Sequence, residues 1–172
     1  MSAKKLNIVI AGATGFVGLD LIKFLSNHPK VKIKYLCAQK NIGKKIQYFD
    51  KRITKNLPKI SKLKSVDWTI IDILFTALPN GESQIICKNL ANKKLKIIDL
   101  SADFRLSDSS VYKKFYGREH LAKKLINKSI YAISEFAKDK LRKFKIIACP
   151  GCYPTSIQLP LVPLLKNNLI NT

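Results

Sequence analysis

The sequence predicts an α/β fold with a doubly wound parallel sheet. Short apolar runs bounded by turn residues alternate with segments whose apolar residues recur at helical spacing, which is typical of strand–helix–strand units. The first of these runs leads into a loop that contains Gly12, Gly15 and Gly18. Because domains usually contain about 100–150 residues, a chain of 172 residues is expected to hold one such domain and at most part of another.

The first quarter of the chain supplies one complete strand–helix–strand unit. Leu6–Ala11 is a continuous apolar run typical of a buried strand, Gly15–Ser26 has the helical period, and Val31–Leu36 is the second strand candidate. Residues 41–66 are rich in lysine and poorly periodic, so we expect loops there with one short strand.

The same alternation continues to the end of the sequence. The further strand candidates are Ile70–Phe75, Lys96–Leu100 and Lys145–Ala148. The further helix candidates are Glu82–Asn92, Arg118–Leu125 and Pro154–Leu165. This order of elements favours a Rossmann-like sheet with helices on both faces.

The net charge of +21 is the most unusual feature of the composition. A strongly basic chain can bind nucleic acid or an anionic membrane surface. The lysines are spread over nearly every segment, only four of the basic residues are arginine, and no helix-turn-helix, zinc-finger or aromatic RNA-binding motif accompanies them. We therefore expect no nucleic-acid partner.

No apolar run approaches the roughly 20 residues that span a bilayer. The first residues lead directly into a strand-like run, without the apolar core and cleavage site of a signal peptide. We expect no membrane association and a cytoplasmic location.

The loop over residues 12–18 has the composition of a phosphate-binding loop. Gly12 permits a tight turn, Gly15 lets the backbone approach a pyrophosphate, and Gly18 allows the helix to pack closely on the sheet. The amide groups at the start of the helix would face the anion. The predicted cofactor contacts are Gly12, Ala13, Thr14, Gly15, Phe16, Val17 and Gly18. The alternative is that the glycines serve only a strand-to-helix turn.

The end of the second strand bears on the choice between NAD and NADP. NAD-specific sites usually carry Asp or Glu about 20 residues beyond the glycine loop, where it binds the ribose hydroxyls. This sequence has none there and supplies Gln39, Lys40, Lys44 and Lys45 instead. These residues suit the additional phosphate of NADP, although they are also typical of a solvated lysine-rich surface.

Cys152 is the candidate nucleophile. It follows a strand and precedes an apolar helical run in which Pro154 suits the first turn, so we expect it just before the start of a helix. The amino terminus of a helix stabilises a thiolate. The alternative is a buried, inert cysteine, which is the expectation for Cys149. The spacing of the two cysteines also occurs in redox and zinc motifs, but a second ligand pair is missing, and we expect no metal.

Three motifs together resemble the N-acetyl-γ-glutamyl-phosphate reductase family. They are Gly-Ala-Thr-Gly-Phe-Val-Gly at 12–18, Asp-Leu-Ser-Ala-Asp-Phe-Arg-Leu at 99–106 and Pro-Gly-Cys-Tyr-Pro-Thr at 150–155. The resemblance implies an enzyme of arginine biosynthesis that reduces N-acetyl-γ-glutamyl phosphate to N-acetylglutamate semialdehyde with NADPH. It further implies that Cys152 displaces phosphate to form a thioester, which receives the hydride. The full-length parent would be a homo-oligomer.

The resemblance also assigns residues to the site. Further cofactor contacts would be Cys37, Ala38, Gln39, Ala77, Leu78 and Pro79, and Lys40 is added to them because its charge suits the phosphate of NADP. The substrate would contact Ser101, Asp103, Arg105 and Gln158. A surface salt bridge between Asp103 and Arg105 is the alternative for that pair.

The family's acid–base histidine lies in a second domain, downstream of the cysteine. Of the two histidines, His28 suits a helix-ending turn and His120 precedes a basic helix expected at the surface, so neither fits this role. We therefore expect a nucleotide-binding domain over residues 1–150, the incomplete start of a truncated second α/β domain over 151–172, and little activity from this chain alone.

Other classes remain as alternatives. Short-chain dehydrogenases and epimerases share the glycine loop but need Tyr and Lys four residues apart, and no tyrosine here has lysine at that distance. Aspartate-semialdehyde dehydrogenase and an aminoadipate-branch enzyme share the chemistry of the cysteine. A non-catalytic nucleotide-binding module would keep the glycine loop without a reactive Cys152.

Overall fold

The computed structural model describes residues 4–171. They contain a seven-stranded sheet in the order β3-β2-β1-β4-β5-β7-β6, in which every neighbouring pair is parallel. The strands are β1 (Leu6–Ala11), β2 (Val31–Cys37), β3 (Ile60–Ser61), β4 (Ile73–Thr76), β5 (Lys96–Asp99), β6 (Ser129–Tyr131) and β7 (Ile146–Ala148). The helices are α1 (Phe16–Ser26), α2 (Glu82–Asn89), α3 (Ser109–Tyr116), α4 (Lys123–Ile126), α5 (Ser134–Leu141) and α6 (Cys152–Lys166). The predicted parallel α/β fold is confirmed.

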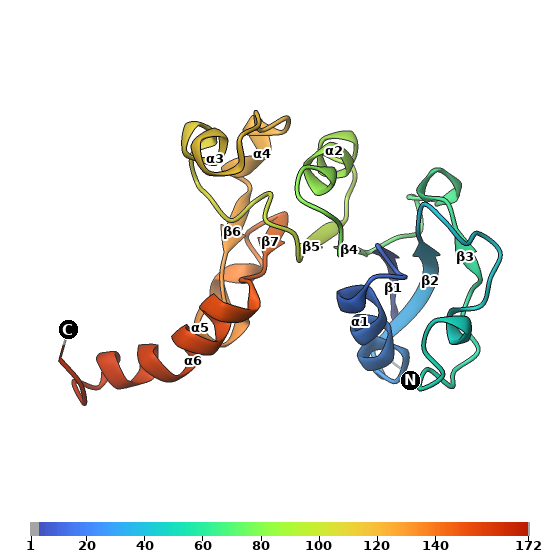
Figure 1. Ribbon diagram of the computed structural model, residues 1–172, viewed down its shortest axis with the longest axis horizontal. Coiled ribbons are helices and arrows are strands. Elements are labelled where there is room, and N and C mark those ends of the chain that lie inside the picture. Colours follow the sequence, from blue (N-terminus) through green and yellow to red (C-terminus); the bar gives the residue numbers. More distant parts are fainter. Residues whose placement is uncertain (1–3, 172) are drawn as a thin grey trace.

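Helices cover both faces of the sheet. In Figure 1, α2, α3 and α4 lie on one side of the strands and α1 and α5 lie on the other. The alternation of side chains along β1 explains why this strand is apolar throughout: Ile8 and Ile10 belong to the core cluster that includes Ile22 of α1, whereas Val9 belongs to the opposite cluster with Leu90 beyond α2. All four β1 and α1 side chains named here are fully buried.

The strand order reverses between β1 and β4. The chain runs from β1 outward through β2 to β3, and then returns to place β4 on the other side of β1. Such a reversal leaves the two loops that follow β1 and β4 diverging from one another, which opens a crevice at the carboxyl edge of the sheet.

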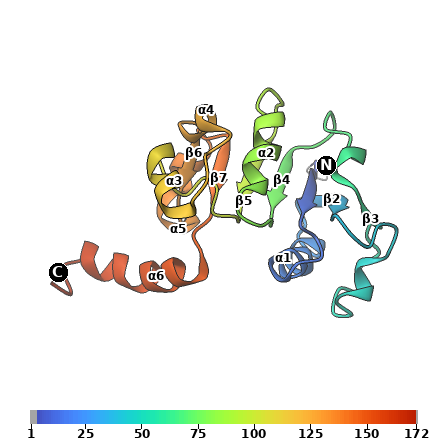
Figure 2. The same cartoon turned by 45° about the horizontal axis from the view of Figure 1, so that its top comes forward.

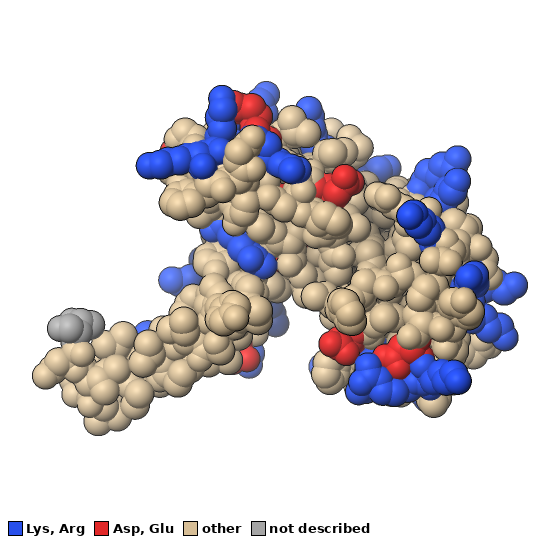
Figure 3. Space-filling view, viewed as in Figure 1, with Lys and Arg blue, Asp and Glu red and all other residues tan. Residues whose placement is uncertain are grey.

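Helix α6 projects away from the sheet, as Figures 1 and 2 both show. Lys166 is its only charged residue, and in the face shown in Figure 3 this arm carries few charged side chains while lysines are spread over the remaining surface. Among residues 4–171, no helix is both long and apolar enough to cross a membrane.

Several predicted boundaries were wrong between residues 101 and 145. The helix expected over Arg118–Leu125 is reduced to the single turn of α4, because the preceding residues turn inward and bury His120. The sequence analysis missed α3, β6 and α5. The loop-rich character of residues 41–66 is confirmed, with β3 and two short 3₁₀ turns, η1 (Ile46–Tyr48) and η2 (Leu63–Ser65).

Candidate functional site

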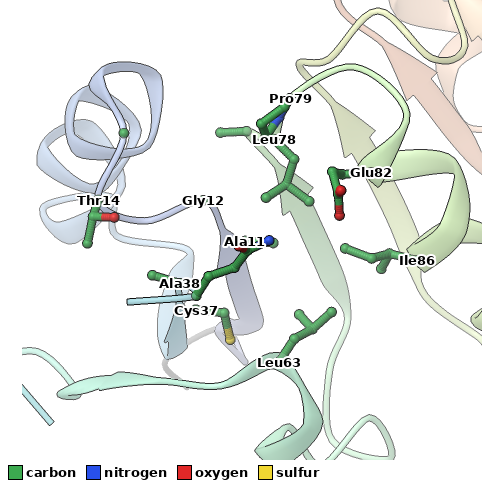
Figure 4. A pocket seen from close by; sticks show the side chains of 13 residues that line it. Ala11, Gly12, Thr14, Cys37, Ala38, Leu63, Leu78, Pro79, Glu82 and Ile86 are labelled. Carbon is green, nitrogen blue, oxygen red and sulfur yellow. The ribbon is translucent and has the colours of Figure 1, made fainter. Parts of the chain in front are cut away.

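A cleft of about 350 Å³ opens where the strand order reverses. The ends of β1, β2 and β4, the loop after β4 and the first turns of α2 surround it, as Figure 4 shows. Its lining residues are Ala11, Gly12, Thr14, Gly15, Cys37, Ala38, Gln39, Leu63, Ala77, Leu78, Pro79, Glu82 and Ile86. The cleft therefore gathers segments that are far apart in the sequence at one edge of the sheet.

The glycine loop forms the turn between β1 and α1. Gly12 has a φ of 87°, and a Cβ at this position would overlap the carbonyl oxygen of Ala77. A Cβ at Gly18 would overlap the backbone of Gly12, so this glycine permits the close approach of α1. At Gly15, the N-cap of α1, a Cβ would meet only the Gly12 oxygen, at 3.5 Å. The exposed amino terminus of α1 thus lies beside the cleft, where its amide groups favour an anion.

The predicted contacts of the glycine loop separate into two groups. Gly12, Thr14 and Gly15 line the cleft. Ala13 is buried in the core, while the side chains of Phe16 and Val17 are 94% and 52% exposed.

The last residue of β2, Cys37, and the loop residues Ala38 and Gln39 line the cleft, whereas Lys40 is exposed and does not. Lys44 lies over the Tyr48 ring, with its Nζ 4.1 Å from the ring centroid. The lining is mainly apolar.

The sequence analysis missed Leu63, Glu82 and Ile86, which complete the lining. Glu82 is the only charged residue among the lining residues, and Figure 4 shows it with Ile86 on α2 across from β1. A signal for Glu82 and Ile86 existed, because they lie on the same side of a helix that directly follows the predicted Ala77–Pro79 contacts. Leu63 had no such local signal.

Cys152 is exposed at the first position of α6, with Gly151 as the N-cap. The helix begins two residues earlier than predicted, so the cysteine lies in the first turn. Arg105 lies beside this loop: its Nε donates to the carbonyl oxygen of Cys149 at 3.0 Å, and a Cβ at Gly151 would be 3.2 Å from its Nη1. The nucleophile candidate therefore has a guanidinium group close to its backbone.

The other cysteines are less accessible. Cys37 and Cys87 are buried, and Cys149 is half-buried at the end of β7. Burial raises the pKa of Cys149 to about 11, and the nearby Asp99 carboxylate adds to this. Burial likewise raises the pKa of Cys37 to about 11. Cys37 and Cys149 therefore form little thiolate near neutral pH. Of the four cysteines, Cys152 alone is exposed.

The predicted substrate residues lie in different environments. Ser101 and Asp103 are buried, at 5% and 0% exposure, whereas Arg105 and Gln158 are half-buried. The alternative of a surface salt bridge between Asp103 and Arg105 is wrong. The Asp103 carboxylate accepts hydrogen bonds from the amides of Gly81 and Gln84, and Arg105 donates to backbone carbonyls.

His120 is buried, contrary to the expected surface position. Its Nε2 lies 2.8 Å from the Asp103 carbonyl oxygen, and its Nδ1 accepts from the amide of Ala122. Burial lowers the pKa of this imidazole. His28 lies in the exposed turn after α1, where its Nδ1 accepts from the Lys30 amide. Neither ring lies in the cleft lining.

Residues 7–144 match the family described as semialdehyde dehydrogenase, NAD binding domain. A protein of rice (Oryza sativa subsp. japonica), named probable N-acetyl-gamma-glutamyl-phosphate reductase, chloroplastic, is 41% identical over 98% of this chain and 41% of its own length. The N-acetyl-gamma-glutamyl-phosphate reductase of Rhodospirillum rubrum is 40% identical over 98% of this chain and 49% of its own length. The chain thus spans less than half the length of these relatives.

Solved structures share the fold at low sequence identity. Aspartate semialdehyde dehydrogenase II of Vibrio cholerae superposes with a TM-score of 0.67 and 19% identity, covering 95% of this chain and 43% of that one. The enzyme of Candida albicans, solved with NADP, gives 0.63 and 19%, covering 95% and 48%. Since the family match extends over most of the sequence and the fold agrees, the chain belongs to the semialdehyde dehydrogenase NAD-binding domain family.

Proposed function

We propose that this chain is the cofactor-binding and nucleophile-bearing part of an enzyme that reduces N-acetyl-γ-glutamyl phosphate to N-acetylglutamate 5-semialdehyde, in arginine biosynthesis. The observation that carries the proposal is the exposed Cys152 in the first turn of α6, at the same carboxyl edge of the sheet as the cleft. The names of the rice and Rhodospirillum rubrum relatives support the choice of substrate.

The cleft suits a nicotinamide dinucleotide. It lies at the reversal of strand order, its floor is free of side chains at Gly12 and Gly15, and it adjoins the amino terminus of α1. Bound NADPH would supply the hydride. Because β4, β5 and β7 are neighbours and strands lie about 4.8 Å apart, the end of β7 is about 10 Å from that of β4, within the reach of a dinucleotide that begins in the cleft.

The chain's own chemistry is that of an acyl transfer to sulfur. The Cys152 thiolate attacks the acyl carbon, the carbon–sulfur bond forms, the bond from that carbon to the phosphate oxygen breaks, and inorganic phosphate leaves with the electron pair. The first-turn amides of α6 favour the developing oxyanion. Arg105, held against the Cys149 carbonyl, is placed to attract the phosphate or carboxylate of the substrate. Gln158 lies on α6, six residues after Cys152.

The proposed cofactor is NADP rather than NAD. The end of β2 carries no acidic residue, and Lys40 and Lys45 are exposed just beyond it. Lys44 is already engaged with the Tyr48 ring. The one negative side chain in the lining, Glu82, lies across the cleft from the end of β2, so it is not where an acidic residue would bind the ribose hydroxyls of NAD.

The remaining parts of the proposal concern the setting of the enzyme. The partner is a small-molecule substrate, and the full-length parent is a homo-oligomer whose second domain supplies the acid–base group. A cytoplasmic location agrees with the chemistry, because the four cysteines are free thiols and the mechanism needs a reduced Cys152.

Alkylation of each cysteine by iodoacetamide, followed by peptide mass spectrometry, tests the site on this chain. Cys152 is expected to react first, because the pKa values of Cys37 and Cys149 are raised. NADPH is expected to slow the reaction of Cys152, and NADH to slow it less at the same concentration. Equal rates at Cys152 and Cys149, unaffected by NADPH, would refute the site.

The substrate is tested with the full-length enzyme. Incubation with N-acetyl-γ-glutamyl phosphate without cofactor should release phosphate and leave the acyl group on the Cys152 peptide. The Cys152→Ser variant should form no thioester, whereas Cys149→Ala should keep the acylated peptide. Acylation by β-aspartyl phosphate in preference would assign the enzyme to the aspartate branch instead.

A further inference from the structure

We propose that Asp103 is a positioning residue that holds one wall of the cofactor cleft in place, and is not a substrate ligand. The inference rests on the proposed function, since it concerns the site where the cofactor binds. The resemblance of the motif at 99–106 implied that Asp103 contacts the substrate, and the inference replaces that role with a positioning role.

Both oxygens of the Asp103 carboxylate are committed to the start of α2. Its Oδ1 accepts from the Gly81 amide at 2.7 Å, and its Oδ2 accepts from the Gln84 amide at 2.9 Å. Gly81 is the N-cap of α2 and has no side chain with which to cap the helix itself. Asp103 therefore caps this helix from 22 residues away in the sequence, and its charge is favourable at the positive end of the helix dipole.

Tyr112 of α3 strengthens the same junction. Its hydroxyl lies 2.8 Å from Asp103 Oδ1 and 2.8 Å from Asn80 Oδ1, and its single proton can be donated to only one of these acceptors at a time. Asn80 precedes Gly81 in the chain, and Asp103 Oδ1 binds the Gly81 amide. The hydroxyl also accepts from Gln84 Nε2 at 3.2 Å. Tyr112 is fully buried, and its ring is fixed between Tyr116 and His120.

The segment that carries Asp103 is itself fixed. Ser101 Oγ accepts from the Asp103 amide at 3.1 Å, and the Ser101 amide donates to Asp99 Oδ1 at 3.1 Å. Asp99 Oδ1 also accepts from the hydroxyls of Thr76 and Ser83, each at 2.7 Å. Two aspartates on one segment thus hold the end of β4 and the first turn of α2.

This junction determines the shape of the cleft because the lining residues flank it. Leu78 and Pro79 precede Gly81, and Glu82 and Ile86 follow it. Gly81 has a φ of 95°, so the direction in which the chain leaves the loop and enters α2 is set at the residue whose amide Asp103 binds. A shift of this amide would move both parts of the wall.

The surroundings of Asp103 exclude direct contact with a substrate. The residue is 0% exposed, and within residues 4–171 it forms no ion pair, its charge being balanced by amide and hydroxyl donors. A carboxylate that already accepts these bonds in the interior cannot turn toward the cleft without leaving buried amides unpaired, which is costly.

The test compares Asp103→Asn with Asp50→Asn. An asparagine keeps one acceptor oxygen and presents an NH₂ group to the second amide, so either Gly81 or Gln84 loses its partner. Asp50 is also nearly buried, at 8% exposure, and accepts the Arg52 amide at 2.9 Å, but it lies in a loop that contributes nothing to the cleft lining. Its carboxylate also pairs with the Arg52 guanidinium, with Arg52 Nη2 2.7 Å from Asp50 Oδ2, so Asp50→Asn is a control for the loss of a nearly buried, hydrogen-bonded carboxylate outside the cleft.

For Asp103→Asn we expect the affinity for NADPH, measured by fluorescence titration of this chain, to fall about tenfold, the size of one lost buried hydrogen bond. We also expect hydrogen exchange to accelerate at the Gly81 and Gln84 amides and to remain unchanged in β1 and β2. For Asp50→Asn, the affinity for NADPH should stay within about twofold.

Two results would overturn the inference: unchanged affinity for NADPH in a folded Asp103→Asn protein, or an equal loss in Asp50→Asn. If Asp103→Asn does not fold, Tyr112→Phe replaces it, because this variant removes one hydroxyl from the same junction. A two- to fivefold weaker binding of NADPH is then expected, and unchanged binding would refute the role.

Failure of the unaltered chain to bind NADPH at all would refute the proposed function and not the hydrogen-bonded junction. The hydrogen-exchange rates of the Gly81 and Gln84 amides report on that junction independently.

Discussion

Gly12 and Gly15 are both glycines of the predicted phosphate loop, yet the structure places different demands on them. Gly12 has a positive φ and is in contact with the Ala77 backbone, whereas Gly15 has ordinary extended dihedrals and an open side. The first position is needed for the fold, and the second is needed only if a ligand approaches the backbone.

The pair Gly12→Ala and Gly15→Ala separates stability from binding. Gly12→Ala should lower the free energy of unfolding by roughly 2–4 kcal/mol, since it combines backbone strain with steric overlap. Gly15→Ala should change it by less than about 0.5 kcal/mol, while weakening the binding of NADPH. Urea unfolding and fluorescence titration measure the two effects. Full retention of cofactor affinity in Gly15→Ala would argue against pyrophosphate binding at this loop.

At the scale of elements, the segment from 101 to 126 shows how local signals compete with burial. Asp108 caps α3 by accepting from the amides of Ser110 and Val111, and Gly117 ends the helix in the left-handed conformation. Both signals are present in the sequence. The helix expected after Gly117 does not form at its predicted start because His120 enters the core between Phe104 and Tyr112.

Glu119 links α3 to α4. Its carboxylate forms ion pairs with Lys113 at 2.7 Å and Lys123 at 2.9 Å. Hydrogen bonds and charge from these two lysines lower the pKa of Glu119 from 4.5 to about 2. Because the folded-state pKa lies below the unfolded value, the stabilising contribution is fully present above pH 4.5 and is lost as the pH falls toward about 2.

The variant Glu119→Gln tests this link. Its thermal midpoint should lie slightly below that of the unaltered chain at pH 7, because exposed ion pairs are weak. The difference should shrink as the pH falls below 4.5 and vanish near 2. Asp139→Asn on α5 is the control, since Asp139 forms no ion pair among the described residues. A difference that does not depend on pH would show that Glu119 acts through packing.

At the scale of the whole molecule, α6 projects from the sheet, and none of its residues is buried. Tyr153, Ile157, Leu161 and Leu165 recur every four residues along it and are 79%, 56%, 40% and 37% exposed. Their spacing places them along one side of α6 as an apolar stripe, and this helix is the projecting arm of Figure 1. An exposed stripe of this kind favours association.

We predict that this chain, produced by itself, self-associates through the stripe as its concentration rises. The double variant Ile157→Lys and Leu161→Lys should shift the sedimentation coefficient toward that of a monomer. Phe24→Lys on α1, which replaces a side chain that is 72% exposed, should not. Association that persists in the double variant, or disappears with Phe24→Lys, would place the contact elsewhere.

Local patterns sufficed for the parallel fold, for the turn at the glycine loop and for the position of Cys152 at the start of a helix, because each depends on neighbours in sequence: the apolar runs, the spacing of Gly12, Gly15 and Gly18, and the cysteine between a strand and a helix. Tertiary contacts decided the remainder. Leu63 reaches the cleft from η2, the turn that follows β3, and Asp103 binds amides 19 and 22 residues away. Whether a carboxylate is exposed to solvent or caps a distant helix depends on how the chain packs, and the neighbouring residues in the sequence do not determine that packing.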